Sequence, residues 1–299
     1  CPSYAPTLFV FDNFETVTNP GELFAWIDSM VRPPNKVLIT TRMRGDFRAD
    51  FPVQVTGMDE PECVQLIENV SEALGIVPKI NETYRQEIID ESDGHPYVIK
   101  VLLGEVVKAG KQRRIERIVA DRDEILLALF ERTYAALTPS AQRVFLVLSN
   151  WSSMVPEIAV EAVILRPANE KIDVTAALEE LVQSSLVDEV ASDDGDTFLN
   201  VPLAAALFGQ RKLVASPWKA AVDADTQFLR AFGATQRTDM RHGLSPRVGR
   251  FFKNVAAAIA DGDHALEDVI PTLEYVCRRY PEGWLLLADL YAEVDSANP

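Results

Sequence analysis

The chain has 299 residues, and its hydrophobic content of 47% and charged content of 25% are those of a globular protein with two or three domains. Its formal net charge of −16 excludes broad adhesion to nucleic-acid backbones and to anionic membrane surfaces, because both would repel it. No apolar run approaches the ~18 residues of a membrane span, and the three cysteines lie too far apart for a metal site. We therefore expect a cytoplasmic protein with reduced thiols and no contact with a membrane.

Two hydrophobic strands and one helix are predicted in the first 41 residues. Residues 7–11 are almost entirely apolar, as in a strand buried on both faces of a parallel sheet, and residues 36–40 have the same character. The helix between them covers residues 21–31, and its apolar face consists of Leu23, Trp26, Ile27 and Met30.

The pattern becomes helical after a shorter strand predicted at residues 53–55. Asp59 and Glu62 have the spacing of a capping box that begins a helix over residues 60–74. Strands followed by helices indicate an α/β domain over residues 1–58 and a helical domain over residues 59–137. The further helices expected in the second of these domains cover residues 84–90, 97–108 and 111–136.

Residues 138–214 combine three helices with a hairpin, which is typical of a winged helix. Thr138 is a good N-cap, with Pro139 in the first helical position. The Asp-Asp-Gly sequence at residues 193–195 is a strong hairpin turn. The predicted helices cover residues 141–148, 157–164 and 174–184, and the strands cover residues 186–190 and 197–201.

The last predicted domain, residues 215–299, is helical. Trp284, Leu287, Ala288 and Tyr291 match the spacing of the first helix of a tetratricopeptide repeat (TPR). Ordinary buried helices share this spacing, so a TPR-like region and a closed helical domain both stay open. In the first case we expect the natural protein to continue with more repeats, which would form a concave surface for a protein ligand.

A carboxylate follows directly after the first predicted strand. Because the carboxyl ends of parallel strands meet at one edge of a sheet, Asp12 is expected at the edge where open α/β sheets hold their ligands. Carboxylate oxygens suit Mg²⁺, and in P-loop NTPases such an aspartate holds the metal beside the nucleotide phosphates. A strand-terminal aspartate is also common without any ligand, so this residue alone leaves both possibilities open.

Four motifs follow one another in an order that resembles the STAND-class P-loop NTPases of the NB-ARC/AP-ATPase type. Residues 8–15 resemble the Walker B strand, and residues 36–42 resemble the strand-and-arginine sensor motif. Residues 93–96 are similar to the Gly-x-Pro motif of the small helical domain, and the winged helix comes next, so the resemblance covers residues 7–214. It implies an α/β plus α fold: the distal part of a parallel-sheet P-loop NTPase domain, a small helical domain, a winged helix and C-terminal helices.

The resemblance also implies ATP or ADP and Mg²⁺ as cofactors, with roles for individual residues. Asp12 would hold Mg²⁺ through water, and Glu15 is the residue that would act as the base in hydrolysis. Arg42 would reach the γ-phosphate, and Thr40 and Thr41 would position its loop. From the residues alone, an arginine after a strand is more often a solvated loop residue.

The Gly-x-Pro motif would hold the adenine base. Pro96 would pack its ring against adenine, with Gly94 and His95 beside it. The plainer interpretation is that Gly-His-Pro is a turn between two helices, which is its most common use.

The chain departs from the family pattern in three places. Residues 104–112 superficially resemble a Walker A motif but lie inside a predicted helix with no preceding strand, so the phosphate loop is expected upstream of Cys1, and the chain is expected to be a piece of a longer polypeptide. Asn13 stands where many ATPases carry an acid, so hydrolysis should be slow unless Glu15 substitutes. Val201 stands where NB-ARC proteins carry the histidine that contacts ADP.

The combined pattern predicts a nucleotide-dependent signalling switch that oligomerises on ligand sensing, in immune or antiphage defence, with a protein ligand or an effector domain as its partner. Its ATPase activity would be slow in the full-length protein and absent from this chain alone. A transcriptional regulator of the same class and a degenerate ATPase scaffold are the alternatives. DNA binding through the winged helix is not expected, because its third helix carries Glu179 and Glu180 and no Lys or Arg.

Overall fold

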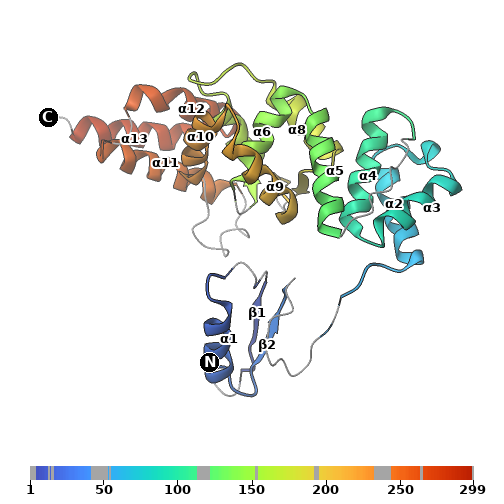
Figure 1. Cartoon of the computed structure of the whole chain (residues 1–299). Coiled ribbons are helices and arrows are strands. Elements are labelled where there is room, and N and C mark those ends of the chain that lie inside the picture. Colours follow the sequence, from blue (N-terminus) through green and yellow to red (C-terminus); the bar gives the residue numbers. More distant parts are fainter. Residues whose placement is uncertain are drawn as a thin grey trace. The chain divides into compact units, whose positions relative to one another are not determined.

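The computed structural model describes residues 5–12, 14, 17–41, 53, 55–112, 122–151, 154–191, 195–231, 244–262 and 265–297. The chain divides into two compact units, Cys1–Thr56 and Gly57–Pro299, whose elements are labelled in Figure 1. Among the described residues, no helix has the length and apolar character needed to cross a lipid bilayer.

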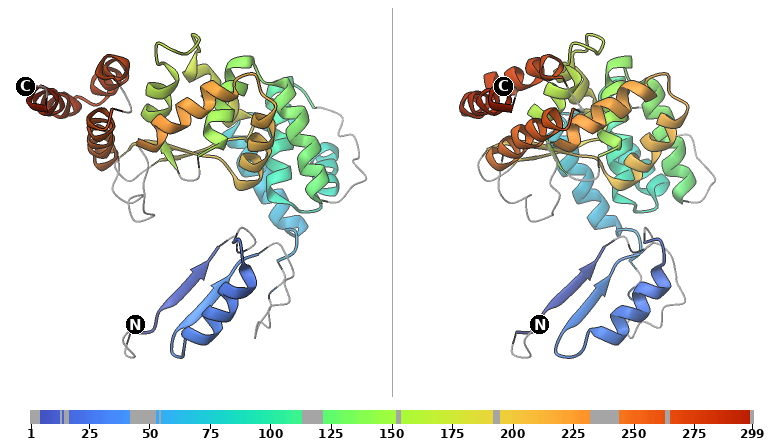
Figure 2. Two further views of the ribbon diagram at one scale, coloured as in Figure 1. Left: turned by 60° about the vertical axis from the view of Figure 1, so that its left-hand side comes forward. Right: turned by 90° about the vertical axis from the view of Figure 1, so that its left-hand side faces the viewer.

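The first unit is a strand, a helix and a second strand. β1 (Leu8–Phe11) and β2 (Lys36–Ile39) pair in parallel, and α1 (Pro20–Met30) connects them and lies beside the pair in Figures 1 and 2. Phe14 and Ile27 are its buried residues, with 1% and 3% of their surface exposed. The predicted α/β character of this part is therefore confirmed. The register pairs Leu8 with Lys36, Phe9 with Val37, Val10 with Leu38 and Phe11 with Ile39.

The strand pair is covered on one face only. Leu8, Val10 and Leu38 point to the opposite face and are 58%, 54% and 51% exposed. Because successive strand side chains alternate between the two faces, the residues between them in sequence are the half-buried ones. The prediction that both strands are buried on both faces is thus wrong for the described residues, because α1 covers only one face of the strand pair.

Two smaller expectations for this unit are also wrong. Trp26 and Met30, expected on the buried face of α1, are exposed, because only Ile27 of this helix is buried. Val53 and Val55 are exposed and belong to no strand, since none of the described strands pairs with them.

The second unit begins with a helix that caps itself as expected. The side chain of Asp59 accepts a hydrogen bond from the Glu62 amide, and the side chain of Glu62 accepts one from the Asp59 amide. The helix predicted over residues 111–136 does not begin at Lys111, because Lys111 and Gln112 are not helical. The described helix covers Arg122–Ala136. The helices of this part are α2 (Glu60–Ala73), the 3₁₀ helix η2 (Val77–Lys79), α3 (Glu82–Ser92), α4 (Pro96–Ala109) and α5 (Arg122–Ala136).

Three helices and a small sheet follow. Thr138 accepts a hydrogen bond from the Ala141 amide, and Pro139 is the first helical residue, as predicted. The sheet is antiparallel in the described region, with the order β3-β5-β4, and the two-residue strand β3 was not expected. The elements are α6 (Pro139–Ser149), β3 (Val155–Pro156), α7 (Glu157–Ile164), α8 (Val174–Gln183), β4 (Asp188–Ala191) and β5 (Thr197–Asn200).

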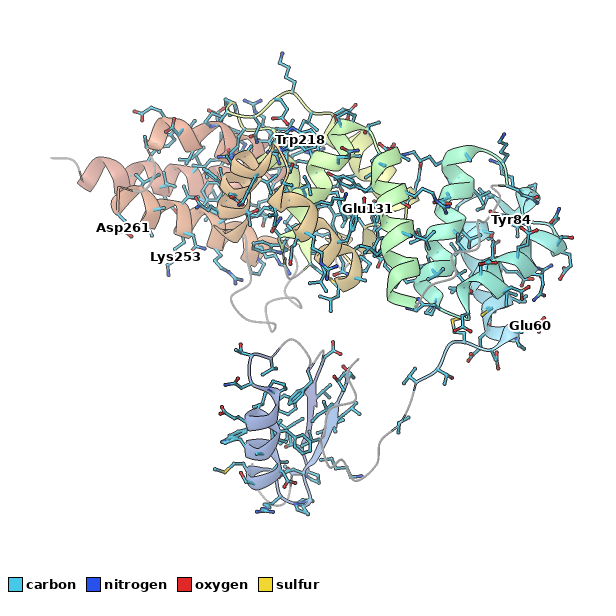
Figure 3. All side chains as sticks on the ribbon, viewed as in Figure 1. Glu60, Tyr84, Glu131, Trp218, Lys253 and Asp261 are labelled. Carbon is cyan, nitrogen blue, oxygen red and sulfur yellow. The ribbon has the colours of Figure 1, made fainter. Side chains whose placement is uncertain are left out.

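The described elements in the remainder of the unit are helices. One cluster of buried side chains runs from Cys63 in α2 to Leu290 in α13, and the side chains between the helices are drawn in Figure 3. In the last helix Leu287 and Leu290 are buried, whereas Trp284 and Tyr291 are 47% and 37% exposed. The C-terminal helices are α9 (Leu203–Val214), α10 (Lys219–Ala231), α11 (Ser245–Ala260), α12 (Leu266–Arg279) and α13 (Gly283–Ala297).

Candidate functional site

The carboxyl ends of β1 and β2 bring Asp12 and Thr40 together. The parallel ladder continues one step past the strands, where the Thr40 amide donates to the Phe11 carbonyl and the Phe14 amide donates to the Thr40 carbonyl, both at 2.9 Å. The Thr40 hydroxyl then donates to Oδ1 of Asp12 at 2.5 Å. Thr41 follows directly, and all three polar side chains are exposed at this edge.

Two predicted members of this site, Glu15 and Arg42, lie outside the described residues, as does Asn13 beside Asp12. Their roles stay predictions.

The oxygen atoms of the side chains at this edge could contact a cation through water. Mg²⁺ keeps several waters and is usually bound through one or two carboxylates together with substrate phosphates. Asp12 is one such carboxylate, and no group of three metal-binding side chains exists among the described residues. One exposed carboxylate held by a neighbouring hydroxyl would suit contact with Mg²⁺ through water.

The Gly-x-Pro motif forms the junction between α3 and α4 in the second unit. Asp93 ends α3 in the left-handed conformation, with φ of 48°. Nδ1 of His95 accepts from the Tyr97 and Val98 amides at 3.2 and 3.4 Å, so His95 is the N-cap of α4. Pro96 is the first residue of that helix and is exposed.

Gly94 is required by packing. Its φ is +69°, and a Cβ there would lie 2.4 Å from the Met58 carbonyl oxygen. Its own carbonyl accepts from the Met58 amide at 2.8 Å. Residues 93–96 therefore form a turn between two helices, as the plainer interpretation predicted. The ring of Pro96 is the part of the Gly-x-Pro motif that is exposed to a ligand.

The predicted site residues therefore form two groups on different units. The Asp12 group belongs to Cys1–Thr56, and the Gly94, His95 and Pro96 group belongs to Gly57–Pro299.

The rejection of residues 104–112 as a phosphate loop is confirmed. Gly104 lies inside α4, where a Cβ would come within 2.7 Å of the Gln183 carbonyl oxygen. Gly110 ends the helix at φ of 68°. The first glycine permits close helix packing and the second permits a left-handed cap, and neither use involves an anion.

The end of α8 packs on α4 at this close approach. The Tyr97 hydroxyl donates to the Ser185 carbonyl at 2.9 Å, and burial, with a smaller contribution from the charge of Asp188, raises the pKa of Tyr97. The carboxylate of Glu180 accepts from Lys108 at 2.7 Å and from the Thr138 hydroxyl at 2.6 Å. The third helix of the predicted winged helix is thus partly engaged by the protein itself.

The ion network around Asp225, which Arg143 and Arg166 contact, was not predicted. The available signal was Arg143 itself, because it precedes the uninterrupted apolar residues 144–148 of a helix that is buried along most of its length.

The chain matches no protein-family model and no curated protein. Among solved structures, it is similar to a Signal Transduction ATPase with Numerous Domains (STAND) protein with a tetratricopeptide repeat sensor from Pyrococcus horikoshii, with a TM-score of 0.49 and 15% sequence identity. The likeness covers 97% of this chain and 39% of that one, so this chain spans less than half the length of the solved structure.

Proposed function

We propose that this chain belongs to a nucleotide-dependent signalling switch of the STAND type. The observation that carries the proposal is the pairing of Asp12 with Thr40 at the carboxyl edge of two adjacent parallel strands. This is the edge at which open α/β sheets bind ligands. It is also where the Walker-B-like and sensor-like motifs of the sequence are expected to meet.

The chain's own residues would act as follows. Asp12 would orient the waters of a nucleotide-bound Mg²⁺, and the Thr40 hydroxyl holds its carboxylate in one orientation. Bound Mg²⁺ would supply charge that offsets that of the phosphates. Arg42 would sense the γ-phosphate, Glu15 would be the base in slow hydrolysis, and Pro96 would pack on adenine.

The other parts of the switch are proposed from their element order. Residues 138–214 have the helix and strand order of a winged helix, and we assign them a protein-packing role because α8 already contacts α4. The C-terminal helices would form a TPR-like sensor for a protein ligand. Ligand sensing together with ATP would release the parts to form a homo-oligomer, in immune or antiphage defence.

The test is Mg²⁺-dependent nucleotide binding by the full-length protein, followed with a fluorescent ATP analogue. Asp12→Asn should lower the Mg²⁺-dependent affinity by about 10–100-fold, because it removes the charge that orients the metal waters. The matched control is Asp28→Asn, which removes an exposed carboxylate from α1. Equal affinities in both variants would reject the assignment of Asp12.

A further inference from the structure

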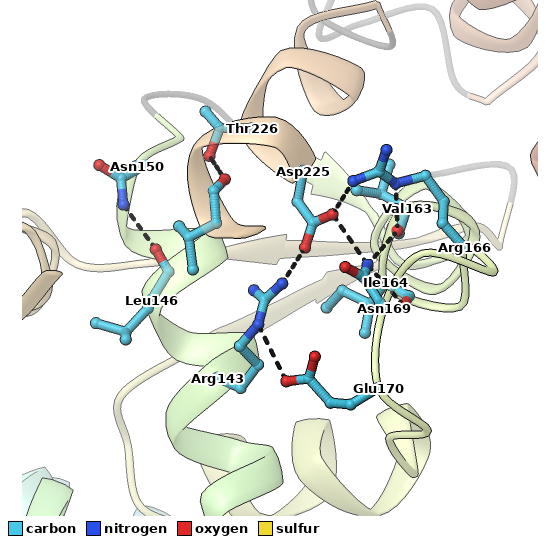
Figure 4. Close-up of polar contacts among 11 residues, drawn as sticks. Arg143, Leu146, Asn150, Val163, Ile164, Arg166, Asn169, Glu170, Asp225 and Thr226 are labelled. Carbon is cyan, nitrogen blue, oxygen red and sulfur yellow. Dashed lines mark hydrogen bonds and ion pairs between the residues drawn. The ribbon is translucent and has the colours of Figure 1, made fainter. Parts of the chain in front are cut away.

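Asp225 is a fully buried carboxylate on α10 that two arginines contact from different parts of the chain. Nη2 of Arg143 on α6 donates to its Oδ2 at 2.5 Å, and Nη2 of Arg166, just after α7, donates to its Oδ1. None of the surface of Asp225 or Arg143 is exposed, and 10% of the Arg166 side chain is. Figure 4 shows this network, in which Glu170 also lies 3.4 Å from Nε of Arg143.

The same network closes the end of α7. The side-chain amide of Asn169 donates to Oδ1 of Asp225 at 3.0 Å and to the Ile164 carbonyl at 3.0 Å. Nε of Arg166 donates to the Val163 carbonyl at 3.1 Å. These bonds satisfy carbonyls that a helix end leaves without partners, so the C-terminus of α7 is folded around a residue of α10.

Joining these helices through buried charges has a high desolvation free energy. Desolvating buried ions cancels most of their attraction, and apolar residues of similar volume often give equal or greater stability. An open state regains the hydration of all these groups, whereas an opened apolar joint exposes hydrocarbon to water. A joint built from buried ions is therefore easier to open reversibly than an apolar joint of the same size.

Two charged residues of the described helices beyond α10 also contact the region of α6 and α7. Arg279 at the end of α12 donates to both carboxylate oxygens of Glu161, at 2.7 and 3.0 Å. The Arg279 side chain is 55% exposed, but the Glu161 side chain is only 5% exposed. On α11, the buried Arg247 donates to the Met154 carbonyl, between α6 and α7, at 2.7 Å. Among the described ion pairs between α6–α7 and the C-terminal helices, the Asp225 network is the one in which the carboxylate and both arginines that pair with it are at most 10% exposed.

We propose that the Asp225 network is a latch that holds α10 and the C-terminal helices α11–α13 closed on α6 and α7. Release of Asp225 lets these helices separate together from α6 and α7, which stay folded with α8. The latch acts within the second unit and does not depend on the proposed nucleotide site.

Hydrogen–deuterium exchange on the whole 299-residue chain tests the latch. Asp225→Asn leaves two buried arginines without their carboxylate, so amides of residues 219–231, 245–260 and 266–297 should exchange about 100-fold faster. Amides of α6 and α8 should keep their rates. The triple variant Arg143→Met, Arg166→Met and Asp225→Leu replaces the ions with apolar side chains and should slow the same exchange about tenfold.

Arg278→Met is the matched control, since it removes an exposed ion pair with Glu274 inside α12 and leaves the contacts with α7 in place, and it should change exchange in α10 by less than about threefold. Equal acceleration in α6, α8 and α10 by Asp225→Asn would overturn the latch, as would unchanged exchange. If Asp225→Asn does not fold, Arg166→Met replaces it, because that variant keeps the Arg143–Asp225 pair. Selective acceleration in α10 then supports the latch, and uniform or absent acceleration rejects it.

Discussion

Thr40 at the end of β2 donates its hydroxyl hydrogen to the carboxylate of Asp12 at the end of β1, 28 residues earlier. One strand end thereby orients the polar group of its neighbour, and the two positions depend on each other. The bond connects the two sequence motifs on which the functional proposal rests.

Replacing the hydroxyl of Thr40 tests this dependence. Thr40→Val keeps the shape of the side chain and removes the donor, so Mg²⁺-dependent binding of a fluorescent ATP analogue to the full-length protein should weaken about tenfold. Thr40→Ser keeps the hydroxyl and should bind nearly as well as the natural protein. Equal weakening in both variants would mean that the methyl group matters and the hydrogen bond does not.

Gly94→Ala should destabilise the second unit. The φ of +69° costs an L-residue about 1–2 kcal/mol, and the new Cβ would also meet the Met58 carbonyl oxygen at 2.4 Å. Gly110→Ala is the control, because its φ is +68° and nothing lies within 4 Å of the new Cβ. Urea unfolding should show a larger loss for Gly94→Ala, and equal losses would contradict the importance of the close approach.

Glu180 should contribute to stability in a pH-dependent way. Burial alone would raise its pKa, but hydrogen bonds from Lys108 and Thr138 outweigh that effect and lower the pKa below 4.5. A carboxyl group whose pKa is lower in the folded state stabilises above the unfolded pKa of about 4.5, and this stabilisation is lost as the pH falls through the folded value. Glu180→Gln should therefore lower the free energy of unfolding at pH 7 and match the natural chain more closely below about pH 4.

The control for this experiment is Glu179→Gln, which removes the same charge from the exposed neighbouring position. Urea titrations across pH 3–7 should show little change for this variant, because exposed charges are well screened. A loss of stability as large as that of Glu180→Gln would show that net charge, and not the contacts of Glu180, is responsible.

The segment of residues 138–214 should not bind duplex DNA. Its third helix carries no basic residue, and its end packs on α4 through Tyr97 and Gly104. Fluorescence anisotropy with a labelled duplex should show no salt-dependent binding by the chain, because no basic surface on α8 faces the phosphates. Binding that weakens with salt and disappears when charges on α8 are reversed would contradict this.

The sequence predicted the features that depend on neighbouring residues. The capping box of Asp59 and Glu62 and the Thr138 N-cap involve contacts three residues apart, and both are present. The placement of Asp12 beside Thr40 was also predictable, because the polar residues that follow two hydrophobic strands meet wherever those strands pair in parallel.

Features that depend on distant residues were not predictable. β3 is two residues long, contains Pro156 and exists through its pairing with β5. The exposure of Leu8 and Val10 depends on how many layers cover the sheet, which the strand pattern does not encode. Asp225 looks like a surface residue of an amphipathic helix until Arg143 and Arg166 are brought against it.

The long sequence separation of these ion pairs has a consequence for synthesis on the ribosome. Arg143 precedes Asp225 by 82 residues, and Glu161 precedes Arg279 by 118. At a translation rate of about 5–20 residues per second, Arg143 therefore waits roughly 4–16 s for its carboxylate partner. During that interval α6 and α7 cannot adopt their final packing without burying Arg143 with only the half-exposed Glu170, 3.4 Å away, as its carboxylate partner. The nascent chain should thus keep these helices loosely packed and accessible to chaperones until α10 has emerged, and mature protease resistance should appear only after residue 225 clears the exit tunnel.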